Sequence, residues 1–157
     1  MLPRTAFELA ESIRDFVVAY DGQDLVGCGA LHIYTPDSAE IRSLAVDAGA
    51  QKSGVGRRIV EALEREAGEF GLAKLFAFTY VPDFFAKLGF GQVDRDELPL
   101  KAWKDCLKCP KFKACDENAV LKNLNVRMIA GDAPLKRGEG VLPFLTRTEV
   151  AKHRPTL

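Results

Sequence analysis

Residues 40–57 decide the fold, and they read EIRSLAVDAGAQKSGVGR. The first seven alternate as in a strand, which predicts one face with Ile41, Ser43 and Ala45 and another with Glu40, Arg42, Leu44 and Val46. A glycine-containing loop follows. Residues 54–70 then form the clearest helix of the chain, because apolar residues recur on one face: Val55, Ile59, Val60, Leu63, Ala67 and Phe70.

The start of this helix is a candidate anion-binding site. Backbone N–H groups at a helix start have no partner within the helix, and the helix dipole is positive there, so this end favours phosphate or pyrophosphate. Gly54 and Gly56 let the backbone approach an anion closely, and Lys52, Arg57 and Arg58 add positive charge. Two glycines also occur in an ordinary loop before a helix. The segment is neither a P-loop nor a dinucleotide-binding GxGxxG sequence.

The rest of the chain alternates between predicted strands and helices. We expect helices at residues 6–14 and 82–88, and strands at residues 16–20, 25–34, 72–80, 91–96 and 118–124. Thr5 and Glu8 have the spacing of a capping box for the first helix. Gly27 and Gly29 indicate a bulge or a close backbone approach in the second strand. The alternation predicts an α/β fold, a mixed central sheet with flanking helices.

Composition limits the class of protein. The 157 residues are 47% hydrophobic, which suits one compact domain. We assign residues 1–124 to this domain and residues 125–157 to a C-terminal extension. Lys and Arg number 22, as do Asp and Glu, so net charge does not indicate a nucleic-acid or membrane partner. No apolar run reaches membrane-spanning length and the first residues do not form a signal peptide, so we expect a cytoplasmic protein.

Two motifs together resemble the GNAT superfamily of N-acetyltransferases. One is Gln-x-x-Gly-x-Gly at residues 51–56, directly after the strand at residues 40–46, and the other is FFAKLGF at residues 84–90. The resemblance implies the GNAT fold and acetyl-CoA as cosubstrate. It also implies that the strands at residues 40–46 and 72–80 splay apart around the pantetheine arm. The CoA-binding residues that it implies are Leu44, Ala45, Val46, Gln51, Lys52, Ser53, Gly54, Val55, Gly56 and Arg57.

Further segments resemble the short bacterial N-acetylglutamate synthases, and this resemblance covers about residues 2–124. It implies acetyl transfer to the α-amino group of L-glutamate, the first step of arginine biosynthesis, by direct attack of the amine on the thioester. The catalytic positions that it implies are Glu40 as the base and Thr79 beside the thioester sulfur. The substrate-binding positions are Arg4, Arg42, Lys101 and Lys104, whose charges would hold the two carboxylates of glutamate.

Departures from the family pattern leave other functions open. Phe85 replaces the tyrosine that commonly protonates the leaving thiolate, so either Tyr80 or water substitutes or the thiolate leaves unprotonated. The resemblance also implies a first strand and helix that precede these residues in the GNAT fold, and we expect either that they are missing or that the natural start lies upstream. We therefore expect an unpaired edge at residues 16–20, covered by the C-terminal extension or by a second copy in a homodimer.

Two other functions stay open. One is acetylation of another amine, such as a polyamine or a protein amino group, for which Asp94, Asp96 and Glu97 would suit a cationic acceptor. The other is an inactive CoA-binding or thiol/metal-sensing module.

Three cysteines lie close together in the sequence: Cys106, Cys109 and Cys115. Three thiols at this spacing could hold zinc or an iron–sulfur cluster. A fourth ligand is not evident, although His32, His153, Cys28 and Asp116 are candidates. Free thiols or a redox switch are the alternatives.

Overall fold

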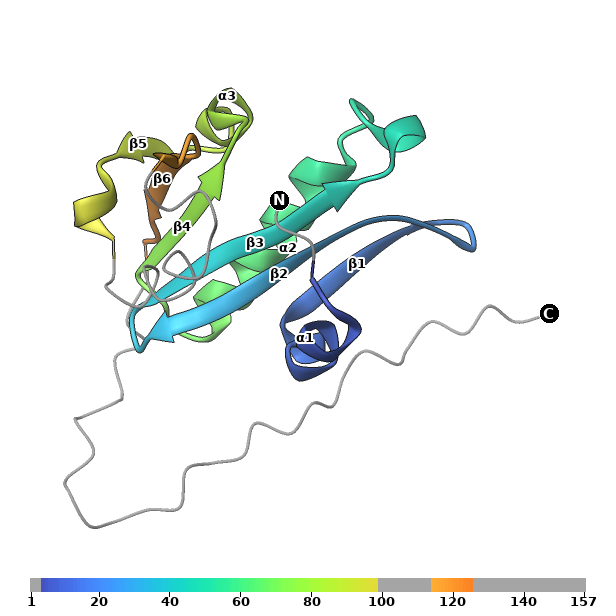
Figure 1. Cartoon of the computed structure of the whole chain (residues 1–157), viewed down its shortest axis with the longest axis horizontal. Coiled ribbons are helices and arrows are strands. Elements are labelled where there is room, and N and C mark those ends of the chain that lie inside the picture. Colours follow the sequence, from blue (N-terminus) through green and yellow to red (C-terminus); the bar gives the residue numbers. More distant parts are fainter. Residues whose placement is uncertain (1–3, 99–113, 126–157) are drawn as a thin grey trace, which may run out of the picture. The chain divides into compact units, whose positions relative to one another are not determined.

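The computed structural model describes residues 4–98 and 114–125, in which six strands form one mixed sheet (Figure 1). The strands lie in the order β1-β2-β3-β4-β6-β5. Their bounds are β1 Phe16–Asp21, β2 Asp24–Thr35, β3 Ser38–Val46, β4 Lys74–Thr79, β5 Gly91–Val93 and β6 Asn118–Asn123. The α-helices are α1 Ala6–Glu11, α2 Val55–Glu69 and α3 Pro82–Ala86, and short 3-10 helices span Ile13–Asp15, Ala48–Ala50 and Arg95–Glu97.

Neighbouring strands pair antiparallel, except that β3 and β4 are parallel. Helix α2 connects these two strands and covers one face of the sheet (Figure 1). The main core lies under this helix, where Ile59 and Leu63 pack with Leu31, Ile41 and Leu75. A second, smaller cluster consists of buried Tyr34, Phe76, Leu98 and Ala119. Because Phe76 alternates with the core residues on either side of it, this second cluster lies on the opposite face. The mixed α/β sheet predicted from the sequence is confirmed.

Helix α1 is shorter than predicted. The Thr5–Glu8 capping box is present as expected, and the helix begins at Ala6. It ends at Glu11, because Ser12 is the C-cap residue, and the Ser12 hydroxyl donates a hydrogen bond of 2.7 Å to the Glu8 carbonyl. The remainder of the predicted helix is the 3-10 helix Ile13–Asp15.

Helix α2 agrees with its predicted stripe except at the C-terminal end. The predicted residues up to Ala67 are buried, but Phe70 is the C-cap and is exposed. Gly71 ends the helix with a φ of 71°, as a C′ glycine does. No helix among the described residues has the length and apolar character that a membrane span requires.

Gly27 and Gly29 allow helix α2 to approach the sheet closely. A Cβ atom at Gly27 would lie 2.9 Å from Cδ1 of Ile59, and one at Gly29 would lie 2.7 Å from Cγ2 of the same residue. Real Cβ atoms do not come this close, so a neighbour must shift. At Gly27 the flexible Cδ1 end of Ile59 can move, whereas Cγ2, which meets Gly29, is attached to the Cβ atom of Ile59 and cannot move without the rest of the side chain. The register of β1 against β2 also shifts between Ala19 and Tyr20, where β2 has one extra residue beside Gly27. The close approach expected for this strand is confirmed, and a bulge in the strand accompanies it.

We expect Gly29→Ala to lower the free energy of unfolding by about 1–3 kcal/mol, the usual cost of overpacking a core. Urea unfolding followed by circular dichroism measures this loss. Gly68→Ala is the matched control, because Gly68 lies in α2 with open space around its Cβ position and should gain about 0.5–1 kcal/mol. Equal stabilities for the two variants would contradict the close packing at Gly29.

The predicted strand at residues 91–96 is shorter in the structure. Strand β5 ends at Val93, and Asp94 is the N-cap of the 3-10 helix Arg95–Glu97. Asp94 and Glu97 form a second capping box, in which the Asp94 N–H donates to the Glu97 carboxylate at 3.2 Å. This local motif ends the strand.

Strand β3 contains a bulge that the sequence pattern did not reveal. The paired positions on β2 advance by two residues from Cys28 to Ala30, whereas their partners on β3 go back by three from Ala45 to Arg42. Ser43 has a φ of 56°, in the left-handed region that residues with a side chain rarely adopt. One extra residue in β3 at Ser43 accounts for both observations.

The bulge corrects the predicted faces of β3. Alternation is wrong after Arg42, because Leu44 and Val46 pack against the core under α2, on the same side as Ile41. Glu40 and Arg42 stay on the opposite face, where their side chains reach β2. The bulge therefore separates a polar half of β3 from an apolar half.

Candidate active site

Strands β3 and β4 form a fork, which we call the β3–β4 fork. They pair in register at three positions, and the last pair is Glu40 opposite Phe76. Strand β3 then continues to Val46 and β4 to Thr79, and the two diverge as expected (Figure 1). Among the described residues no strand pairs with this side of β3 beyond Glu40. Its backbone N–H and C=O groups can therefore bind an extended ligand in the fork.

The loop after β3 presents the uncapped start of helix α2. Gly54 is the N-cap, with φ 88° and ψ 0°, and the helix start has no side-chain cap. The first N–H groups of the helix, which begin with Val55, therefore have no partner from a capping side chain. Two contacts hold the loop behind them: the Gln51 side chain donates to the Val46 carbonyl at 3.4 Å, and the Ser53 hydroxyl donates to a carbonyl within the loop.

Positive charge surrounds this helix start. Lys52, Arg57 and Arg58 are all exposed. A hydrogen bond of 2.7 Å and the negative charge of Glu61 raise the pKa of Arg57, which therefore stays protonated. Glu61 pairs with Arg57 and not with Arg65, which the i,i+4 spacing would also allow. A polyanion at the helix start would meet backbone N–H groups and cations together.

Glu40 lies where the fork opens, on the face opposite helix α2. Its side chain accepts a hydrogen bond of 2.9 Å from the hydroxyl of Tyr34 on β2. Tyr34 is buried and belongs to the second core cluster with Phe76. The carboxylate is thus held beside the point where β3 and β4 separate.

Arg42 lies two residues further along the same face of β3. Its Nη2 is 3.0 Å from Nδ1 of His32, and the same ring nitrogen is 2.8 Å from a carboxylate oxygen of Asp15. One nitrogen cannot donate to Asp15 and accept from Arg42 at the same time. Arg42 is also 3.9 Å from Asp15, so this carboxylate partly balances its charge. The structure thus brings Glu40 and Arg42 together on one face, although Arg42 already has partners.

The end of β4 carries two hydroxyl groups. Thr79 is buried, and its Oγ1 accepts a hydrogen bond of 3.0 Å from the Val81 N–H, so its own hydrogen remains available to donate. Tyr80 is half exposed, and its hydroxyl donates to a carboxylate oxygen of Asp116 at 3.0 Å. To protonate a leaving group, Tyr80 would first have to give up this contact.

Comparison with protein families agrees with this geometry. The model of the acetyltransferase (GNAT) family matches residues 3–90, more than half of the chain. The chain belongs to the GNAT family. Its sheet is therefore a GNAT fold, and the protein is an N-acetyltransferase with acetyl-CoA as cosubstrate.

Several relatives of this GNAT chain cover most of the described part. An uncharacterized N-acetyltransferase of Chlorobaculum tepidum is 43% identical over 79% of this chain and 80% of its own length. The amino-acid acetyltransferase of Mycobacterium tuberculosis is 37% identical over 60% of this chain and 56% of its own length. The solved N-acetylglutamate synthase of Neisseria gonorrhoeae, complexed with coenzyme A and N-acetyl-glutamate, superposes with a TM-score of 0.72 at 30% identity. The match covers 79% of this chain and 29% of the synthase.

The residues of the GNAT chain suit acetyl-CoA. The uncapped start of α2 with its cations suits the pyrophosphate, and the open edge of β3 in the fork suits the amide-containing pantetheine arm. A ligand also has space to approach the loop at Gly56. A Cβ atom there would lie 3.5 Å from the Phe84 ring and from Val46. These are ordinary contact distances, so the neighbouring side chains do not fill the space at Gly56.

Phe85 does not belong to the polar part of the GNAT site. It is buried in the main core, and its ring contacts Phe84 and Phe90 edge-on at 5.2 Å between centroids. Phenylalanine has no proton to donate, so a leaving thiolate would have to take its proton from another group.

The remaining predicted site residues are Arg4, the two lysines and the cysteine cluster. Arg4 is partly buried and directly precedes the N-cap of α1. Lys101, Lys104, Cys106 and Cys109 lie outside the described residues. Cys115 is a partly buried free thiol, and its carbonyl accepts a hydrogen bond of 3.1 Å from Arg95. Within residues 4–98 and 114–125, no group of three His, Cys, Asp or Glu side chains could hold a metal ion.

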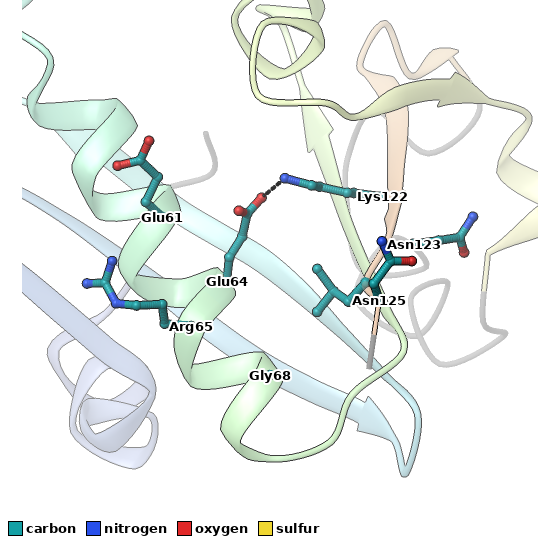
Figure 2. A pocket seen from close by; sticks show the side chains of 8 residues that line it. Glu61, Glu64, Arg65, Gly68, Lys122, Asn123 and Asn125 are labelled. Carbon is teal, nitrogen blue, oxygen red and sulfur yellow. Dashed lines mark hydrogen bonds and ion pairs between the residues drawn. The ribbon is translucent and has the colours of Figure 1, made fainter. Parts of the chain in front are cut away.

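A hollow of about 560 Å³ lies elsewhere, between α2 and the end of β6 (Figure 2). Its main charges are paired, because Lys122 donates to Glu64 at 2.6 Å and to the Leu88 carbonyl at 2.7 Å. Lys122 also lies over the Phe90 ring, 5.5 Å from its centroid. Since Lys122 joins α2, β6 and the turn after α3, we interpret this hollow as part of the scaffold.

The sequence reasoning missed Tyr34 and Asp15. Tyr34 could have been found from the period of β2, because His32 and Tyr34 are two residues apart and so share a face of the sheet with their neighbours on β3. Asp15 offered no such signal, because it lies between the helix predicted at residues 6–14 and the strand predicted at residues 16–20.

Proposed function

We propose that this GNAT protein transfers the acetyl group of acetyl-CoA to the α-amino group of an amino acid, with L-glutamate as the acceptor. The observation that carries the proposal is the position of Glu40 and Arg42 on one face of β3, where the fork opens. A carboxylate can accept a proton from the amine there, beside a cation that suits an acceptor carboxylate. Relatives named amino-acid acetyltransferase and N-acetylglutamate synthase support this choice of acceptor.

In the proposed reaction, acetyl-CoA supplies the activated acetyl group. The start of α2 and residues 51–57 bind the pyrophosphate, and the backbone of residues 44–46 binds the pantetheine arm. Glu40 takes a proton from the ammonium group, directly or through water, so that the amine nitrogen can form a bond to the acetyl carbon. The carbon–sulfur bond breaks, and the nitrogen loses its second proton. A proton reaches the leaving sulfur through the Thr79 hydroxyl, Tyr80 or water, which is reprotonated by the proton from the nitrogen, and the proton on Glu40 passes to solvent.

Two cations are proposed to hold the acceptor carboxylates, Arg42 in the fork and Arg4 before α1. When the acceptor binds, Arg42 would replace its contact with His32 by a contact with the acceptor carboxylate, while Asp15 would stay hydrogen-bonded to the His32 ring. Lys101 and Lys104 are further proposed contacts. For the cationic-acceptor alternative, Asp94 and Glu97 accept each other's backbone N–H groups in a capping box, and both residues are exposed.

We expect Arg4→Ala to raise the KM for L-glutamate about ten- to a hundredfold and to leave the KM for acetyl-CoA within about twofold, because a charge-assisted hydrogen bond is lost at one substrate only. Steady-state kinetics with each substrate varied in turn checks this. Arg14→Ala is the matched control, since Arg14 is exposed in the neighbouring 3-10 helix. Equal changes for both substrates would remove Arg4 from the acceptor site.

We also propose that the protein forms a homodimer through strand β1. This strand is at the end of the sheet order, and its side chains Val18 and Tyr20 are exposed. It carries no lysine or proline, the residues that commonly protect an edge. Light scattering should therefore show a dimer that Val18→Lys converts to a monomer; a wild-type monomer, or a dimer unaffected by the lysine, would refute this interface.

A further inference from the structure

We propose that Tyr34 is a positioning residue, which holds the Glu40 carboxylate in the orientation needed for proton transfer. The inference rests on the proposed role of Glu40 as the base. It assigns a function to a side chain that neither motif contains.

The strand register places the two residues together. Glu40 on β3 is directly opposite His32 on β2, so Tyr34 is its diagonal neighbour on the same face. The phenol hydroxyl donates to Oε2 of Glu40 at 2.9 Å. Since a carboxylate has two oxygens in fixed geometry, holding Oε2 sets the direction of Oε1.

Tyr34 is rigid enough to act as an anchor. Only 8% of its surface is exposed. Its ring packs on Phe76 with centroids 5.7 Å apart, and the His32 ring meets it edge-on at 4.8 Å. Leu98 and Ala119 complete this buried cluster. The long side chain of glutamate is therefore tied to a phenol that its own packing already fixes.

The hydrogen bond also favours the form of Glu40 that the reaction needs. A donor to a carboxylate stabilises its ionised state, and only the ionised state can accept a proton. Loss of the hydroxyl should therefore allow Glu40 to protonate at higher pH, and the acidic limb of the kcat/KM profile should move upward in pH. A purely structural role for the ring would not produce this shift, because phenylalanine keeps the ring.

The test is a double-mutant cycle of Tyr34→Phe and Glu40→Gln, with acetyl-CoA and L-glutamate as substrates. We expect Tyr34→Phe to lower kcat about ten- to a hundredfold, to leave the KM for acetyl-CoA unchanged and to shift the acidic limb upward. In the Glu40→Gln background the same change should cost less than about twofold, because no base remains to be positioned.

Each outcome has a distinct meaning. A wild-type kcat for folded Tyr34→Phe overturns the positioning role of Tyr34. So does an equal loss of kcat in the wild-type and Glu40→Gln backgrounds. Neither result removes Glu40 as the proposed base. If Glu40→Gln alone keeps wild-type turnover, then Glu40 is not the base, and the inference falls together with that part of the proposed function. The inference is supported if Tyr34→Phe lowers kcat only in the protein that has Glu40, and if the acidic limb of the kcat/KM profile also moves upward in pH.

Discussion

Glu40→Gln should lower kcat about a hundredfold to ten-thousandfold, the range that a positioned general base contributes. The variant keeps the size of the side chain and an oxygen for the Tyr34 hydroxyl, so the fork should keep its shape. What it loses is the capacity to take a proton from the ammonium group at neutral pH. Fixed-time assays of thiol release at saturating concentrations of both substrates measure this loss of kcat.

Two controls make this result specific to Glu40. Calorimetry should show acetyl-CoA binding with wild-type affinity, because the CoA site is proposed to involve residues 44–46 and 51–57. Glu69→Gln should keep wild-type turnover, since Glu69 is exposed at the end of α2. A kcat for Glu40→Gln within about threefold of wild type would exclude it as the base, because general-base catalysis contributes far more.

The second large effect is expected at the start of α2. Gly56→Val should weaken acetyl-CoA binding by about a hundredfold or more, because its side chain would stand between the phosphates and the helix N–H groups, and each charge-assisted hydrogen bond is worth about 1.5–3 kcal/mol. A Cβ atom at this position meets Phe84 and Val46 at ordinary contact distance, and the Cγ atoms of valine reach further, so Gly56→Ala is the milder companion variant and both must be shown to be folded. Isothermal calorimetry with CoA and a thermal melt separate the two effects.

Gly68→Val is the matched control for Gly56→Val. It places the same side chain in the same helix, at a position with nothing within 4 Å of the Cβ site. Its CoA affinity should equal that of the wild type. A folded Gly56→Val protein with unchanged affinity would show that the pyrophosphate binds elsewhere.

Local patterns predicted local structure well in this chain. The Thr5–Glu8 capping box and the stripe of α2 each depend on residues a few positions apart. The same logic would have ended β5 at Val93, since Asp94 and Glu97 form a second box.

The bulge at Ser43 shows where sequence patterns fail. Strict alternation was the natural prediction for β3, but one inserted residue reverses every face that follows it. No residue type in this stretch signals the bulge, because Ser43 carries a positive φ that glycine would ordinarily take. The reversal matters for the site. Glu40 and Arg42, before the bulge, face the fork, whereas Leu44 and Val46, after it, pack against the core.

Contacts between strands were equally hidden. Tyr34 and Glu40 are six residues apart and meet only through the register of β2 against β3. Arg42 was expected to meet an acceptor carboxylate, but its neighbours His32 and Asp15 come from two other elements. The residue types predicted which charged groups belong to the site, but only the fold shows which of these groups are already paired with other side chains.

Acetyl transfer to an amino acid can be measured as the release of free thiol from acetyl-CoA in the presence of a panel of acceptors. The panel should contain L-glutamate, L-glutamine, L-aspartate, L-lysine and spermidine, with mass spectrometry of the products. We expect acceptor-dependent thiol release with the highest kcat/KM for L-glutamate, and a product that carries one acetyl group on the α-amino nitrogen. Thiol release that depends on spermidine and not on any amino acid, or acetyl-CoA binding without turnover of any acceptor, would refute the proposed transfer to an amino acid.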